Sequence, residues 1–195
     1  MGSEKIENAQ AVVHKISLPT KITLLRILLV PFLLAFLIAP SRVNALVAAL
    51  IFGAAALTDW LDGHLARSTH QITTLGKLLD PIADKILLAA GLIPLVGLER
   101  VPAWMAAIML IREFAVSGLR EIAAAEQVII PASPMAKAKT FLQILAILFL
   151  ILHYQTWPLT FHTMGLALLT LSLILSVVSG VDYYQKCRRG LQYRW

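Results

Sequence analysis

Four aspartates stand at fixed spacings in a chain of 195 residues, 58% of which are apolar. They belong to the pattern D-x2-D-G-x2-A-R-x8-G-x3-D-x3-D, which runs from Asp59 to Asp84. Asp59 and Asp62 are spaced i,i+3, and Asp80 and Asp84 are spaced i,i+4, so on helices each pair presents both carboxylates on one face. A carboxylate within a membrane costs roughly 2.5–3.5 kcal/mol on insertion scales, so four together call for compensating cations. Two such faces turned toward each other predict an all-oxygen site for hard divalent metals.

Small and basic residues accompany the aspartates in the same pattern. Gly63 and Ala66 follow Asp59 at i+4 and i+7, nearly on its side of a helix, and small side chains there let phosphates approach the backbone. Arg67 can neutralise a phosphate through a bidentate contact. Gly76 extends the stripe of the second aspartate pair by one turn. The alternative, a small-residue packing seam with a snorkelling arginine, leaves the aspartates unexplained.

The elements that carry these residues are expected to be membrane-spanning helices. Six apolar stretches are each about long enough to cross a bilayer. The sequence therefore predicts an all-α, polytopic membrane protein with six transmembrane helices and a short N-terminal juxtamembrane segment. The expected spans are residues 23–40, 44–66, 78–98, 102–124, 135–153 and 160–184. Spans two to four contain charged residues, which are functional candidates because charge is costly at that depth.

The composition fits one membrane-embedded domain, since only 14% of the residues are charged. We expect a cytoplasmic or interfacial segment at 1–20, a six-helix domain at 21–185 and a basic cytoplasmic tail at 186–195. The first segment mixes charged and apolar residues, which suits either a helix on the membrane surface or a disordered tail.

The basic residues predict the orientation. A net charge of +6 could indicate a nucleic-acid partner, but with the N-terminus in the cytoplasm 15 of the 17 Lys and Arg residues fall on the inner side. Only Arg42 and Arg100 fall outside. Both termini are therefore expected to be cytoplasmic, and no nucleic acid is expected. The single cysteine, Cys187, excludes an internal disulfide.

At every specified position, the aspartate pattern resembles the signature of the CDP-alcohol phosphotransferase family, integral membrane enzymes that make phospholipids. The resemblance implies CDP-diacylglycerol as donor, two Mg²⁺ or Mn²⁺ ions held by the four aspartates, Asp84 as the catalytic base, and a homodimer. The residues that it implies for donor binding are Thr23, Asp59, Gly63, Ala66, Arg67 and Gly76.

A second segment narrows the resemblance. Residues 112–121, followed by Lys137, Lys139, Thr140 and Gln143, resemble the bacterial phosphatidylglycerophosphate synthases of that family, whose acceptor is sn-glycerol 3-phosphate. The resemblance implies acceptor binding by the basic residues Arg112, Arg120, Lys137 and Lys139.

Helix geometry refines this set. Arg112 and Arg120 would lie about 12 Å apart along one helix, close enough to border one pocket. The alternative for Arg112 is an ion pair with a nearby glutamate or with the metal-site aspartates. Lys137 and Lys139 would point about 200° apart, and Lys137, nearer the helix start, is the favoured contact.

The expected reaction is transfer of the phosphatidyl group from CDP-diacylglycerol to glycerol 3-phosphate, in the inner membrane of a bacterium with the active site on the cytoplasmic side. Two alternatives stay open. The acceptor could be another alcohol, such as inositol phosphate or serine. A protein of another class, a cation transporter with an aspartate-lined path, would also need membrane carboxylates.

Overall fold

The computed structural model describes residues 18–39, 41–69, 74–127, 134–154 and 158–192, apart from the side chains at 18–19, 59–69, 74–78, 154, 158–160 and 191–192. This part of the chain forms six α-helices and one short 3₁₀ helix, with no strand, which confirms the all-α, six-helix expectation. The elements are α2 (Leu18–Ile38), α3 (Arg42–Thr69), α4 (Thr74–Gly97), α5 (Ala103–Ala125), α6 (Pro134–Ile151), η1 (Leu152–Tyr154) and α7 (Pro158–Gln192). Most of the predicted segment 1–20 lies outside the described residues.

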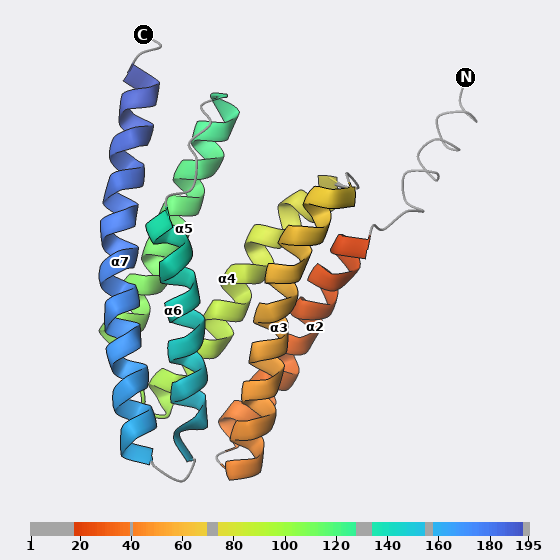
Figure 1. Ribbon diagram of the computed structural model, residues 1–195, viewed down its shortest axis with the longest axis vertical. Helices are drawn as coiled ribbons and strands as arrows, with labels where there is room; N and C mark the ends of the chain where they lie inside the picture. The colour runs from red at the N-terminus through yellow and green to blue at the C-terminus, as the bar shows by residue number, and fades with distance from the viewer. Residues whose placement is uncertain (1–17, 40, 70–73, 128–133, 155–157, 193–195) are drawn as a thin grey trace, which may run out of the picture.

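Successive helices run in opposite directions, so that α2, α4 and α6 begin at the end of the bundle where α3, α5 and α7 finish (Figure 1). We call this end the polar end. In the same view α2, α3 and α4 form one group and α5, α6 and α7 another. Helix α2 packs on both α3 and α4, whereas α7 packs on α5 and α6. The aspartate pattern therefore lies toward the polar end, since it spans the second half of α3 and the first half of α4.

An apolar core joins the two groups. Phe52 of α3 and Ile147 of α6 are almost completely buried, and Gly91 of α4 lies between them. A Cβ added at Gly91 would lie 2.9 Å from the Phe52 ring and 3.2 Å from the Ile147 side chain. The glycine thus allows α4 to approach both helices, and this contact fixes α4, which carries two of the aspartates.

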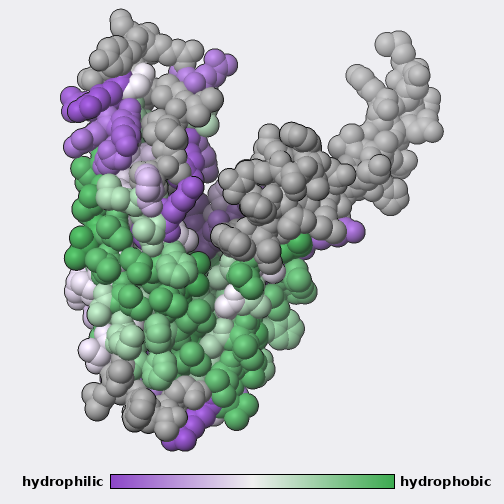
Figure 2. All heavy atoms as spheres, viewed as in Figure 1, coloured by the Kyte–Doolittle hydropathy of each residue, from purple (hydrophilic) through white to green (hydrophobic). Residues whose placement is uncertain are grey.

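The outer surface of the bundle is apolar. Leu28, Leu50 and Ile111 are each more than 60% exposed, which water would penalise and lipid would not. Figure 2 shows hydrophobic residues as a broad band between hydrophilic residues toward either end. By length and composition, three helical segments of the described chain can cross a membrane: Thr20–Ile38, Pro134–Ile151 and Phe161–Gly190. Helix α3 adds a shorter apolar stretch, Arg42–Thr58, and α4 and α5 carry the charged residues expected of site helices.

Helix α7 extends beyond its predicted span. Its candidate span, Phe161–Gly190, has 30 residues and is about 45 Å long at 1.5 Å per residue, longer than the hydrocarbon core of about 30 Å. Residues 186–192 of the predicted tail continue this helix. Lys186 donates to Asp182 at 2.6 Å, an i,i+4 pair, while Tyr183 and Cys187 are buried. These contacts explain why the helix persists after the apolar sequence ends.

The opposite end of the bundle is held by Arg100. Its guanidinium is buried and donates to the carbonyl oxygens of Leu150 and Ile151, both at 3.1 Å, at the end of α6. The imidazole of His153, in η1 just past this helix, meets the ring of His162 edge-on with 5.2 Å between centroids. Burial, together with the positive charge of Arg100 and the neighbouring His162, lowers the pKa of His153 below its ordinary value of 6.5.

His153 makes stability depend on pH. Because its pKa is lower in the folded chain, the unfolded chain binds more protons as the pH falls through about 6.5. The unfolding temperature is therefore expected to be constant above pH 7.5 or so and to fall toward pH 5.5, whereas His153→Gln should flatten this decline. Thermal unfolding of the detergent-solubilised protein across this range measures both. An equally steep decline in the variant would contradict the role of His153.

Candidate active site

Helix α2 supplies a partner to Asp80 and to Asp84, the two aspartates of the pattern whose side chains the structure describes. The hydroxyl of Thr23 donates to Asp80 Oδ1 at 2.5 Å, and Arg26 NH1 donates to Asp84 Oδ1 at 2.8 Å. Such short distances are typical of hydrogen bonds to a charged group. Thr23 and Arg26 lie one turn apart on α2, as Asp80 and Asp84 do on α4, so the two pairs stack along the α2–α4 contact.

The donors are buried and the carboxylates are accessible. Thr23 and Arg26 are each 2% exposed, whereas the side chain of Asp84 is 51% exposed and Asp80 is also exposed. The two hydrogen-bond donors thus contact the carboxylates from within the helix bundle, and the carboxylates remain accessible at its surface. Hard oxygen donors held in this way fit a divalent metal ion.

The other members of the aspartate pattern lie on the helices where they were expected. Helix α3 runs without a break through Asp59, Asp62, Gly63, Ala66 and Arg67, and Gly76 lies in the first turn of α4. Their side chains lie outside the described residues. Among the residues whose side chains the structure describes, no group of three or more His, Cys, Asp or Glu residues could hold a metal ion. These described side chains do not include those of the first aspartate pair. The four-aspartate metal site therefore stays a prediction.

A second polar cluster joins α5 to α7. Arg112 Nε donates to the carbonyl oxygen of Ser176 at 2.7 Å, and Arg112 NH2 donates to Ser179 Oγ at 2.7 Å. A Cβ at Gly180 would lie 3.2 Å from Arg112 Nε, so the glycine makes room for the guanidinium. Farther along α5, the Arg120 guanidinium lies 5.9 Å from the centre of the Tyr183 ring. Both arginines therefore lie along the contact between α5 and α7.

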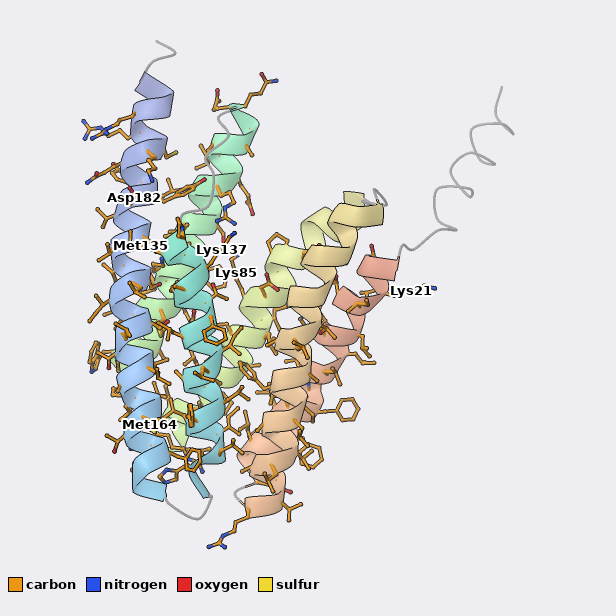
Figure 3. The ribbon with its side chains drawn as sticks, in the orientation of Figure 1. Lys21, Lys85, Met135, Lys137, Met164 and Asp182 are labelled. Atoms are coloured by element: carbon orange, nitrogen blue, oxygen red, sulfur yellow. The ribbon has the colours of Figure 1, made fainter. Side chains whose placement is uncertain are left out.

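Glu113 connects this cluster to α6. Its Oε1 accepts a hydrogen bond from Arg112 NH1 at 3.0 Å and another from Lys139 Nζ. Arg112, Glu113 and Lys139 are mostly buried, with side chains 12%, 20% and 5% exposed. Lys137, by contrast, is exposed near the start of α6. Figure 3 shows Lys137 and Lys85 at a similar level, on the half of the bundle opposite Met164.

The structure thus joins only two of the four candidate acceptor residues through a shared partner. Arg112 and Lys139 share one carboxylate inside the helix bundle, while Arg120 and Lys137 are exposed. The pairing of Arg112 with a neighbouring glutamate is the alternative that the sequence left open. It leaves part of the guanidinium fork for a ligand, since each terminal nitrogen carries two hydrogens.

Arg26 and Glu113 are candidate site residues that the sequence analysis did not select. Arg26 was counted only as a basic residue on the cytoplasmic side. A buried arginine one turn after Thr23 could have been recognised from its helical spacing and its cost in an apolar span. Glu113 directly follows Arg112, and sequence neighbours on a helix do not normally face one another, so its link to two cations could not be read from spacing.

Comparison with known proteins places the chain in a family. The family model described as CDP-alcohol phosphatidyltransferase matches residues 16–178. A Bacillus subtilis protein named CDP-diacylglycerol–glycerol-3-phosphate 3-phosphatidyltransferase is 38% identical over 182 residues, covering 87% of this chain and 94% of its own length. Proteins of the same name from Rickettsia felis and Salmonella choleraesuis are 38% and 35% identical, covering 89% and 90% of this chain and 96% and 97% of their own lengths. With a family match over most of its length and relatives that align almost from end to end, this chain belongs to the CDP-alcohol phosphatidyltransferase family.

Proposed function

We propose that this protein transfers the phosphatidyl group of CDP-diacylglycerol to sn-glycerol 3-phosphate, releasing CMP and phosphatidylglycerophosphate. The observation that carries the proposal is the near full-length similarity to several proteins named for this reaction. The site chemistry supports it, because the polar half of the bundle combines exposed carboxylates on α4 with a basic cluster on α5 and α6.

The donor side of the proposed site is acidic. Asp59, Asp62, Asp80 and Asp84 would hold divalent metal, in our proposal two ions of Mg²⁺ or Mn²⁺. Bound there, the metal would supply positive charge against the diphosphate and the developing charge on CMP. Residues proposed to contact the donor are Thr23, Asp59, Gly63, Ala66, Arg67 and Gly76.

The chain's own residues account for the remaining steps. Thr23 and Arg26 hold the two carboxylates of α4 in place. Asp84 would take the proton from the acceptor hydroxyl, whose oxygen attacks the β-phosphorus of the donor. The new phosphorus–oxygen bond forms as the bond to CMP breaks, and CMP leaves with the bridging oxygen.

The acceptor side is basic. Arg112, Arg120, Lys137 and Lys139 together would attract the phosphate dianion of glycerol 3-phosphate. The exposed Arg120 and Lys137 suit direct contact, as do the remaining hydrogens of Arg112. Lys139 is 4% exposed and bonded to Glu113, so its contribution would pass through that carboxylate. A choline or ethanolamine acceptor would instead call for aromatic or acidic partners.

The protein is a membrane protein, and we propose the inner membrane of a bacterium, with the polar end and both termini in the cytoplasm and the chain paired as a homodimer. The proposed divisions are the interfacial segment 1–20, the catalytic domain 21–185 and the basic tail 186–195. The distribution of Lys and Arg supports this orientation.

Cysteine labelling tests the orientation. Native Cys187 is only 2% exposed, which makes it a poor probe, whereas Arg42 and Arg188 are exposed in helices that reach opposite ends of the bundle. In a Cys187→Ser background, Arg42→Cys is expected to react with an impermeant maleimide on intact cells, and Arg188→Cys only after permeabilisation. The reverse pattern would contradict a cytoplasmic polar end.

The activity is tested with purified protein, CDP-diacylglycerol and one acceptor at a time. We expect CMP release with glycerol 3-phosphate and none above background with inositol phosphate or serine. Release with one of the other acceptors would keep the family chemistry and change the acceptor. The cation transporter is the remaining rival, and the absence of CMP release with any acceptor would favour it.

A further inference from the structure

The ion cluster between α5 and α6 contains a residue with no role in the proposed reaction. Glu113 receives hydrogen bonds from Arg112 and Lys139 on a single carboxylate oxygen. The two cations belong to different helices and both are proposed to serve the acceptor. The charge that separates them is therefore part of the acceptor site rather than an isolated surface pair.

We propose that Glu113 is the positioning residue of the acceptor site, which holds Arg112 and Lys139 in the arrangement that receives the acceptor's phosphate. The inference rests on the proposed function, since it assigns Glu113 to the same site. Without this carboxylate, two buried cations would stand close together in a low-dielectric environment and repel one another. With it, α5 and α6 are tied at the depth of the cluster.

The anchoring of Arg112 is complete only with Glu113. The guanidinium is fixed to α7 through Ser176 and Ser179 and to its own helix through Glu113. These three bonds use one hydrogen on each of its nitrogens and so set the plane of the group. A planar fork held in one orientation binds phosphate with less loss of rotamer freedom than a mobile one.

Glu113 acts by placing charge. The three side chains carry two positive charges and one negative charge, a net charge of +1. Replacing both Glu113 and Lys139 by glutamine keeps this net charge, since Arg112 stays charged, but it removes the bridge between the helices.

The test compares KM values in four purified full-length variants with CDP-diacylglycerol and glycerol 3-phosphate. Glu113→Gln and Lys139→Gln should each raise the acceptor KM about tenfold and leave the donor KM within twofold. The double variant should also be about tenfold worse, not the roughly hundredfold expected of independent sites, because each substitution removes the same bridge. Glu99→Gln is the control, an exposed glutamate in the connection between α4 and α5 with no side-chain hydrogen bond or ion pair to another described residue, and should change neither KM.

The outcomes separate the claims. Unchanged KM values in Glu113→Gln, or an equal rise in the donor KM and the acceptor KM, would overturn the positioning role. The proposed function would still be supported by CMP release by the parent protein. Independent effects of the two substitutions would also overturn it. Should Glu113→Gln fail to fold, the double variant, which removes the lysine charge together with the carboxylate, decides by the same split between the two KM values. A parent protein that releases no CMP with glycerol 3-phosphate would refute the proposed function and this role with it.

Discussion

Asp80→Asn is expected to lower kcat for CMP release by on the order of 10²–10³-fold or more, the loss typical when one charge-stabilising group leaves a preorganised site. Asparagine keeps the Oδ1 oxygen that accepts the hydrogen bond from Thr23, so the contact between α2 and α4 should survive. What disappears is the negative charge that would hold a metal ion. Alanine at Asp59, Asp62 or Asp84 is expected to abolish activity as well.

Two further experiments test this prediction: removal of the metal ion, and substitution of an aspartate that lies outside the pattern. Activity should vanish in EDTA and return with Mg²⁺ or Mn²⁺, whereas Ca²⁺, which favours looser and higher coordination, should not restore it. Asp182 is the fifth aspartate and pairs with Lys186 on α7, away from the pattern. Asp182→Asn should retain near-parental activity. Full turnover in chelator, or equal loss from Asp182→Asn and Asp80→Asn, would refute the metal assignment.

Arg120→Ala and Lys137→Ala are expected to raise the KM for glycerol 3-phosphate about 10- to 150-fold, the range for loss of one charge-assisted contact worth about 1.5–3 kcal/mol. Both side chains are exposed, and among the described residues Arg120 contacts the Tyr183 ring. Folding should therefore change little, which makes these variants better probes than Arg112→Ala. The latter also breaks three hydrogen bonds to described groups.

The donor serves as the internal control for these variants. The donor is proposed to bind the face formed by α2, α3 and α4, so its KM should stay within about twofold while the acceptor KM rises. Thermal unfolding of the same samples would detect any general loss of structure. A raised KM for CDP-diacylglycerol with an unchanged acceptor KM would move Arg120 and Lys137 to the donor side.

The helices could be predicted well from hydropathy. The expected span 102–124 corresponds to α5, Ala103–Ala125, because an apolar run between short connections leaves little choice of boundary. The end of α7 was missed by eight residues, Gln192 against residue 184. Hydropathy falls at Asp182, but the buried Tyr183 and Cys187 show that the helix keeps a packed face beyond that point.

The site could be predicted only in part. The spacing of Asp80 and Asp84 indicated one helix face, and both lie along one side of α4 in contact with α2. The partnership of Arg26 with Asp84 joins positions 58 residues apart and depends on how α2 packs on α4, which no local pattern contains. Helical spacing indicated that Lys137 and Lys139 diverge, but the buried position of Lys139 follows from the packing of α6 on α7.

The most direct test of the central claim follows the oxygen atoms of the acceptor. Glycerol 3-phosphate labelled with ¹⁸O in its hydroxyl groups is incubated with the protein, CDP-diacylglycerol and Mg²⁺, and both products are weighed by mass spectrometry. If the acceptor hydroxyl attacks the β-phosphorus, the phosphatidylglycerophosphate retains all of the label and the CMP carries none. Label in CMP, loss of label from the lipid, or no labelled lipid at all would contradict phosphatidyl transfer to glycerol 3-phosphate.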